Sequence, residues 1–221
     1  MRDLILQLSK SSIYSTKPPY IEINAQQLEQ NLRHMQAKAD EAGVALRPHI
    51  KTHKSVFIAR RQRELGAHGI TVSKPSEGVS FLLGGERDLL LAYPVVRAES
   101  IAELFLTAAK YQAKITLIVD ALQGVAAIAE AQRQQPDCDL SVIIKVDVGL
   151  HRIGINPHNN DALQLAQSLK EYGLRFAGLV SHAGHAYGAG NAAAICIIAQ
   201  QEAQLMHALQ VKLRNAGFDF C

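Results

Sequence analysis

Seven short runs predicted as strands alternate with longer segments of helical pattern, and this rhythm constrains the fold more than any other feature. Most of the runs are apolar on both faces, and the loops that join them to the helices are only a few residues long. Runs of this kind are typical of a parallel sheet that helices cover. The predicted strands are residues 19–23, 45–51, 69–73, 88–93, 114–120, 140–149 and 174–182.

Capping residues mark the ends of the predicted helices. Asn24 is expected to cap a helix that ends near Glu41, and Ser55 a helix that ends near Leu65. Pro75 fits the first turn of a third helix, because proline needs no hydrogen-bond partner there. Further helices are predicted at about 99–110, between 120 and 140, through 163–169, and at about 191–215.

Two architectures fit this order of elements, an open doubly wound sheet and a (β/α)8 TIM-type barrel. The first strand is not followed by the dinucleotide-binding pattern GxGxxG, and the P-loop pattern GxxxxGK[ST] is missing as well. The barrel is therefore favoured. Since the sequence has neither a linker nor a low-complexity tract, residues 1–221 are expected to form one barrel domain.

Charge and composition exclude several classes of protein. The formal net charge is +3, which is too small to indicate binding to nucleic acid. No apolar run approaches the roughly 18–20 residues needed to cross a membrane, and the start MRDLILQLSK lacks the features of a signal peptide. Three cysteines at irregular spacing are too few for a disulfide framework, and they favour a reducing, cytoplasmic location.

The predicted strand ALRPHIK continues into THK and is unusually basic. Arg47, His49, Lys51 and His53 are spaced by two, so they would share one face of a strand. If Pro48 and Ile50 face the helices, the basic row points into the barrel. A lysine amine held beside other cations in a partly desolvated site loses its proton readily and attacks aldehydes. This chemistry suits a Schiff base between Lys51 and pyridoxal phosphate (PLP).

Polar residues recur where the predicted strands end. Lys51 ends one strand, Arg152 follows the strand VIIKVDVG, and His182 ends AGLVSH before a glycine-rich stretch. The carboxyl ends of parallel strands meet at one edge of the sheet, so these groups are expected to lie together around one opening of the barrel, here called the mouth.

Four motifs resemble segments of one family. RPHIKTHK (47–54) resembles the cofactor-lysine motif of the D-threonine aldolase and D-serine dehydratase group, which are PLP enzymes of the alanine racemase fold type. KVDVGLHRIGI (145–155) is similar to the segment whose arginine contacts the PLP ring hydroxyl, and SHAGHAYG (181–188) to the segment beside the pyridine ring. GITVSKPSEG (69–78) matches the third element of the family in place and pattern. The resemblance covers the chain from about Tyr20 onward and implies the N-terminal barrel domain of that fold type.

The resemblance implies a role for five residues. Lys51 would form the internal aldimine and take the α-proton of the substrate. Arg152 would donate to the phenolic oxygen of PLP. Tyr187 would lie near the ring nitrogen with His182 behind it, and His49 would point inward beside Lys51.

Other polar residues keep two interpretations. His53 is expected at the surface near a helix start, and contact between His185 and PLP or substrate is left open. Ser55 is interpreted as a helix cap rather than a phosphate contact. Asp147 either holds Arg152 or is a structural carboxylate. His182 and His185 alone are weak evidence for zinc, and no residue of this sequence is assigned to a metal.

The family implies a PLP-dependent lyase that cleaves or dehydrates D-β-hydroxy amino acids, acting as a homodimer on a small D-amino acid. An amino-acid racemase of the same fold type, a non-catalytic PLP-binding protein and an inactive fragment are the alternatives. Family members continue beyond Cys221 with a phosphate-binding loop, a last barrel strand and a β-domain that holds zinc or manganese. The barrel is therefore expected to be incomplete at its C-terminus, and a divalent metal is expected only with the missing domain.

Overall fold

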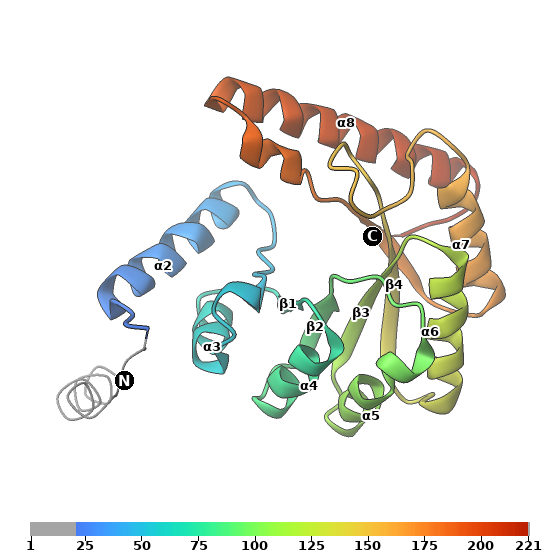
Figure 1. Cartoon of the computed structure of the whole chain (residues 1–221), viewed down its shortest axis with the longest axis horizontal. Coiled ribbons are helices and arrows are strands. Elements are labelled where there is room, and N and C mark those ends of the chain that lie inside the picture. Colours follow the sequence, from blue (N-terminus) through green and yellow to red (C-terminus); the bar gives the residue numbers. More distant parts are fainter. Residues whose placement is uncertain (1–20, 221) are drawn as a thin grey trace. The chain divides into compact units, whose positions relative to one another are not determined.

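A computed structural model describes residues 21–220 of the chain, which contain two compact units (Figure 1). The first unit ends at Val44, and the second begins at Ala45. In the first unit, helix α2 spans Ala25–Glu41, and the side chain of Asn24 caps it as predicted. The predicted first strand is wrong for residues 21–23, which have no regular secondary structure, while residues 19 and 20 lie outside the described part.

The second unit contains a five-stranded sheet whose neighbouring strands are all parallel. The strands are β1 (Ile70–Val72), β2 (Asp88–Leu91), β3 (Lys114–Val119), β4 (Asp139–Lys145) and β5 (Phe176–Val180). The α-helices of this unit are α3 (Val56–Glu64), α4 (Pro75–Leu83), α5 (Ala102–Lys110), α6 (Leu122–Gln134), α7 (Asp161–Glu171) and α8 (Ala192–Asn215). Three 3-10 helices complete it, namely η2 (Ile50–Thr52), η3 (Ala98–Ser100) and η4 (Gly184–Gly188).

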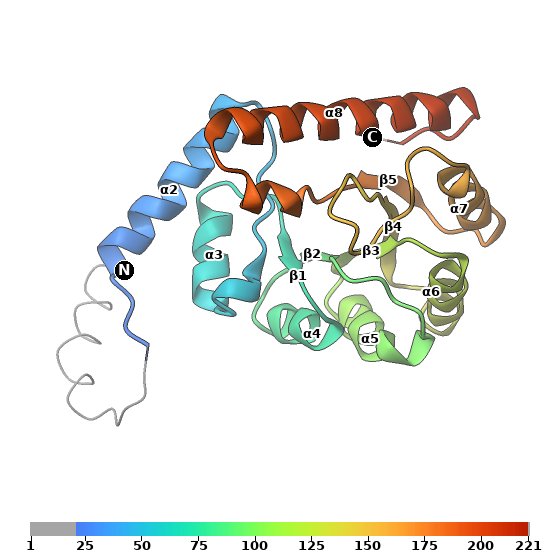
Figure 2. The ribbon, with the colours of Figure 1, turned by 45° about the horizontal axis from the view of Figure 1, so that its top comes forward.

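The strands follow one another in the sheet in their sequence order, β1-β2-β3-β4-β5. Helices α4, α5, α6 and α7 lie along the same face of the sheet (Figures 1 and 2). A doubly wound sheet would reverse its strand order at a switch point and carry helices on both faces. The described residues therefore wind as a TIM-type barrel does and supply five of the roughly eight strands that close one.

Aliphatic side chains in register hold the sheet against its helices. Leu89 of β2 pairs with Ile115 of β3, and Ile115 pairs with Leu140 of β4. These three side chains are at most 8% exposed. Two residues further along each strand, Leu91, Leu117 and Val142 pair in the same way. Alternate side chains of these strands therefore pack under the helices, and the others face the barrel interior.

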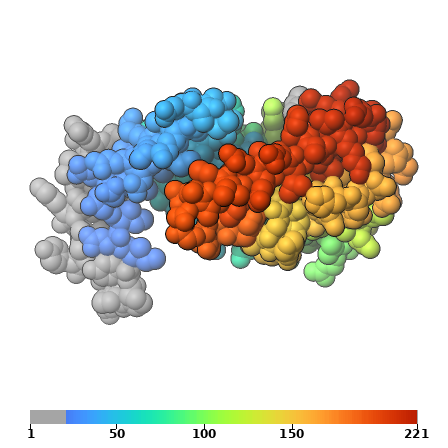
Figure 3. Space-filling model, turned by 90° about the horizontal axis from the view of Figure 1, so that it is seen from above, coloured from blue at the N-terminus to red at the C-terminus, as the bar shows by residue number. Residues whose placement is uncertain are grey.

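Helix α8 is the longest helix of the second unit, and it forms one surface of that unit (Figure 3). Leu209 and Leu213, one turn apart, are buried, and Leu205 and Met206 pack against the same core. The first turns are apolar but mostly exposed, as Ile195 and Ile197 show. Within residues 21–220, neither this helix nor any other combines the length and the hydropathy that a membrane span requires.

The predicted strand at residues 45–51 is wrong. His49 makes a single bridge to Thr71, and the chain then turns into η2 because the N–H groups of His53 and Lys54 both donate to the carbonyl of Ile50. Once the chain turns, the spacing of two no longer places side chains on one face. Arg47 leaves the row altogether, since its guanidinium pairs with Asp88 at 2.8 Å, at the beginning of β2.

Leu117→Ala should lower the free energy of unfolding by about 2–5 kcal/mol, because Leu117 is fully buried in β3 and truncation leaves a cavity. Urea denaturation measures this loss. Leu83→Ala is the matched control, since Leu83 is 64% exposed, and its expected effect is below about 0.5 kcal/mol. Equal losses in the two variants would contradict the described core.

Candidate active site

The site lies where β1, β4 and β5 end and the loops after them begin. Lys145 is the last residue of β4, and His182 follows β5 by two residues. The positive charges of Lys145, Arg152 and Lys51 all act on His182 and, after burial, lower its pKa. The structure therefore brings Lys51, Arg152 and His182 together, although they are more than a hundred residues apart from first to last.

Lys145 is the most strongly perturbed cation of the site. Its side chain is 6% exposed, and burial followed by repulsion from Arg152 lowers its pKa to about 8. Glu202, Asp147 and Asp120 partly oppose this shift. Lys145 was not predicted as a site residue from the sequence, where it only begins the motif KVDVGLHRIGI. The feature that could have revealed it is a lysine in the otherwise apolar run VIIKV, at a position that faces the barrel interior.

The loop that carries Arg152 is closed on itself after β4. Val146 bridges Ile155, and the N–H of Gly154 donates to Asp120 at 3.1 Å. Gly154 has φ +117°, and a Cβ atom there would lie 2.6 Å from the backbone nitrogen of Asp147, so only glycine fits. Arg152 is therefore presented at the tip of a loop whose two ends are joined.

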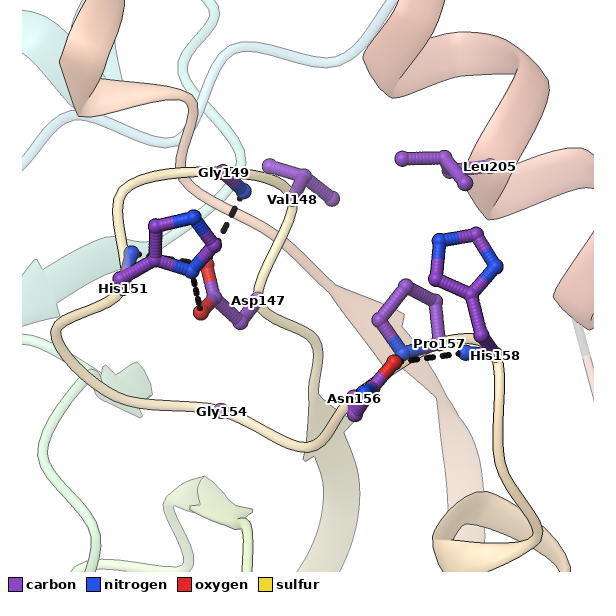
Figure 4. A pocket seen from close by; sticks show the side chains of 9 residues that line it. All are labelled: Asp147, Val148, Gly149, His151, Gly154, Asn156, Pro157, His158 and Leu205. Atoms are coloured by element: carbon purple, nitrogen blue, oxygen red, sulfur yellow. Dashed lines mark hydrogen bonds and ion pairs between the residues drawn. The ribbon is translucent and has the colours of Figure 1, made fainter.

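Asp147 organises this loop from inside. It accepts the N–H groups of Gly149 and His151, each at 3.0 Å, and its carboxylate lies 2.9 Å from Nδ1 of His151 (Figure 4). Burial alone would raise the pKa of Asp147, but these hydrogen bonds together with the charge of His151 lower it. The structure thus gives Asp147 a structural role in the loop. A cavity of about 330 Å³ lies between this loop and Leu205 of α8.

The segment after β5 presents His182 and Tyr187 as a pair. Their ring centroids are 6.0 Å apart with an edge-on arrangement, and Tyr187 is 88% exposed. A cavity of about 340 Å³ lies beside them, between η4 and α8. At its wall, the hydroxyl of Ser181 donates to Glu202 of α8 at 2.6 Å. This contact ties the end of β5 to α8.

Lys51 lies in η2 with an exposed side chain. Its backbone N–H donates to Nδ1 of His49 at 3.4 Å, so the ring of His49 lies against the backbone of the Lys51 turn. Burial and then repulsion from Lys51 lower the pKa of His49, while Glu77 and the backbone of Thr71 oppose the shift. The predicted inward strand face is replaced by a turn at the mouth, where the amine of Lys51 is open to a ligand.

Three other residues are placed by local contacts. Ser55 caps α3, since its hydroxyl accepts the N–H of Ile58. His53 is half-buried, and its Nδ1 accepts the N–H of Ser55, so the expectation of a surface histidine is wrong. The ring of His185 lies against the backbone of Gly149, which links η4 to the Arg152 loop. Within residues 21–220 no three His, Cys, Asp or Glu side chains are grouped as metal ligands would be.

The chemistry of these groups fits the binding of PLP. Neighbouring cations lower the pKa of His49, His182 and Lys145, in each case in addition to burial, which shows that the mouth has a positive potential. Such a potential favours an anionic ligand with phosphate and phenolate groups. Lys51 supplies an exposed primary amine at the same mouth, and Arg152 supplies a planar donor.

A parallel sheet with helices along one face and cationic side chains beyond the carboxyl ends of its strands is typical of the barrel class of α/β proteins. The family model for the alanine racemase N-terminal domain matches residues 23–219, and the chain belongs to this family. The barrel-type α/β fold predicted from the sequence is thereby confirmed.

Several relatives carry names of lyases. A D-threo-3-hydroxyaspartate dehydratase from Delftia sp. (strain HT23) is 32% identical over 209 residues, which cover 94% of this chain and 54% of the relative. A D-threonine aldolase from Arthrobacter sp. is 38% identical over 169 residues, which cover 75% of this chain and 43% of the relative. The crystal structure of a D-threonine aldolase from Filomicrobium marinum has a TM-score of 0.86 and 26% identity, over 94% of this chain and 56% of that one. The chain spans about half the length of the curated relatives it matches.

The lowered pKa of His182 predicts a loss of stability in acid. Protonation below about pH 6.5 favours the unfolded chain, so the stability due to the neutral ring is lost as the pH falls through the folded-state pKa. His182→Gln should therefore flatten the fall in the free energy of unfolding as the pH is lowered below about 6.5. Denaturation at several pH values measures this slope, and His207→Gln on the exposed face of α8 is the control. An unchanged slope in His182→Gln would contradict the described environment.

Proposed function

We propose that this chain forms the cofactor-binding part of a PLP-dependent lyase that acts on D-β-hydroxy amino acids. The observation that carries the proposal is the convergence of Lys51, Lys145 and Arg152 on His182 at one mouth of the barrel. The names of the relatives, D-threo-3-hydroxyaspartate dehydratase and D-threonine aldolase, support the class of substrate.

When bound, PLP would supply the electron sink that stabilises a carbanion at the substrate α-carbon. Lys51 would hold the aldehyde carbon of the cofactor through Nζ and later accept the α-proton of the substrate at the same atom. Its place in an exposed turn suits both tasks, since the amine can be reached from the mouth. His49 would stay neutral at physiological pH because its pKa is lowered, and so would add no further repulsion beside Lys51.

Arg152 would donate to the phenolate oxygen of PLP from the closed loop after β4. The Asp147 hydrogen bonds hold that loop, so the guanidinium would be positioned before the cofactor binds. Tyr187 and His182 would face the ring from the segment after β5, where their rings are 6.0 Å apart. Lys145 would contribute positive potential from the end of β4, where its side chain is buried beneath the cofactor-binding groups.

The remaining assignments rest on the family. Retro-aldol cleavage and dehydration both break a bond at Cβ, and a metal that binds the β-hydroxyl would assist either reaction. The zinc or manganese site, the phosphate loop and the homodimer expected from the resemblance belong to this proposal, as does a cytoplasmic location. An amino-acid racemase of the same fold is the alternative, and incubation with D-threonine, D-serine and D-3-hydroxyaspartate distinguishes cleavage, dehydration and racemisation by product.

Borohydride reduction of the chain with PLP, followed by peptide mapping, should place the pyridoxyl group on Lys51. Reduction fixes the carbon–nitrogen bond between amine and cofactor, so the labelled peptide identifies the residue. Lys51→Ala should abolish the label. Labelling of Lys54, Lys74 or Lys145 in place of Lys51 would overturn the assignment.

Arg152→Ala should weaken PLP binding by about tenfold or more, because it removes a charged hydrogen bond, and should shift the absorption spectrum of the bound cofactor. Titration with PLP measures the affinity, and circular dichroism checks the fold. Arg133→Ala, on the exposed face of α6, is the matched control. An Arg152→Ala protein that unfolds and retains an unchanged cofactor spectrum in its folded fraction would support a structural role instead.

A further inference from the structure

Glu77 is a buried carboxylate at the edge of the site that the proposed mechanism does not use. It lies in the first turn of α4, just after β1, and is 9% exposed. One carboxylate oxygen accepts the backbone N–H of Ser73 at 2.8 Å. The other lies 3.3 Å from the ammonium of Lys54, which is 58% exposed. A single acid thus connects the end of β1 to the turn that follows Lys51.

The turn that Glu77 contacts is under backbone strain. Lys54 has φ +47°, a left-handed conformation that residues other than glycine seldom adopt. Its N–H donates to the carbonyl of Ile50 at 2.8 Å, and Ile50 is completely buried. Lys51 therefore lies between a buried anchor on one side and a strained residue on the other. The ion pair with Glu77 is a contact that reaches Lys54 from another element and can hold it in this conformation.

We propose that Glu77 is a positioning residue for Lys51, and that the ion pair between Glu77 and Lys54 holds the turn at residues 50–54 against the end of β1. The ion pair holds the turn at Lys54, its last residue, and the burial of Ile50 holds it at its first residue. The side chain of Lys51 is then presented at the mouth by a backbone that is fixed on both sides. The reason why this geometry matters rests on the proposed function, because it assumes that Lys51 holds the cofactor.

Helix capping alone would be the simpler role for Glu77, and its contact with Ser73 resembles a cap. Glutamine separates the two roles. In Glu77→Gln the amide oxygen can still accept the N–H of Ser73, whereas the charge that attracts Lys54 is lost. The negative charge of Glu77 also acts on His49, together with Lys51, His182 and the backbone of Thr71. Loss of this charge should lower the pKa of His49 further in either role, so the exchange rates of the turn amides separate the two roles and the pKa of His49 checks that the charge was lost.

Hydrogen–deuterium exchange of the full chain without cofactor tests the contact. In Glu77→Gln the amides of His53 and Lys54 should exchange about threefold to fivefold faster, as expected for the loss of a partly exposed ion pair, while the amides of α4 keep their rates. NMR titration should show the ring of His49 losing its proton at a lower pH. Asp139→Asn is the matched control, because it removes a paired carboxylate at the beginning of β4.

Lys54→Met should accelerate the same amides, and the double variant should exchange no faster than either single variant, since both remove one interaction. Unchanged exchange in Glu77→Gln, additive effects in the double variant, or faster exchange throughout α4 would each overturn the proposal. A PLP titration then tests the link to function, with an expected loss of affinity of about threefold to fivefold in Glu77→Gln. If exchange changes and PLP affinity does not, the turn is held by Glu77 but Lys51 is not the residue that holds PLP.

Discussion

The parallel register of the buried aliphatic residues is the constraint on which the site depends. Because Leu89, Ile115 and Leu140 lie side by side in neighbouring strands, these strands begin at a common level and end near a common edge. Residues of very different sequence position are thereby brought to one mouth. The polar groups themselves contribute little to this arrangement, since charges at the mouth repel one another and lower the pKa of Lys145 and His182. The core supplies the free energy that holds them together.

Nearby carboxylates neutralise the positive potential of the mouth only in part. Glu202, Asp147 and Asp120 oppose the lowered pKa of Lys145, yet all three already accept hydrogen bonds from other donors. Glu202 accepts the hydroxyl of Ser181, Asp147 accepts two backbone N–H groups of its own loop, and Asp120 accepts the N–H of Gly154. Their hydrogen bonds fix loops and strand ends, so their charges remain only partly available to Lys145 and Arg152. An anionic ligand would complete the neutralisation, which is the physical basis for the proposal that PLP binds here.

Local signals predicted the helices well, and contacts between distant residues decided what the sequence could not show. Asn24, Ser55 and Pro75 each stand at the helix start that was predicted from them, since a cap acts within one turn. The strand predicted at 45–51 failed because alternation cannot reveal a turn held by Ile50 and by the ion pair between Lys54 and Glu77. Lys145 was not predicted as a site residue, because it stands at the end of an apolar strand and only the three-dimensional arrangement shows which charges surround it.

Two carboxylates on helices support the mouth at positions far apart in the sheet. Glu77 of α4 reaches the end of β1 and the Lys51 turn, and Glu202 of α8 reaches Ser181 at the end of β5. Each acid comes from the helix that follows the strand whose end it holds, so its support is built within one strand–helix unit. A barrel made of such units can therefore hold the loop after each strand independently of the others. Loops fixed in this way can carry different polar residues without disturbing the aliphatic register beneath them, which explains how a site of this complexity fits on so regular a sheet.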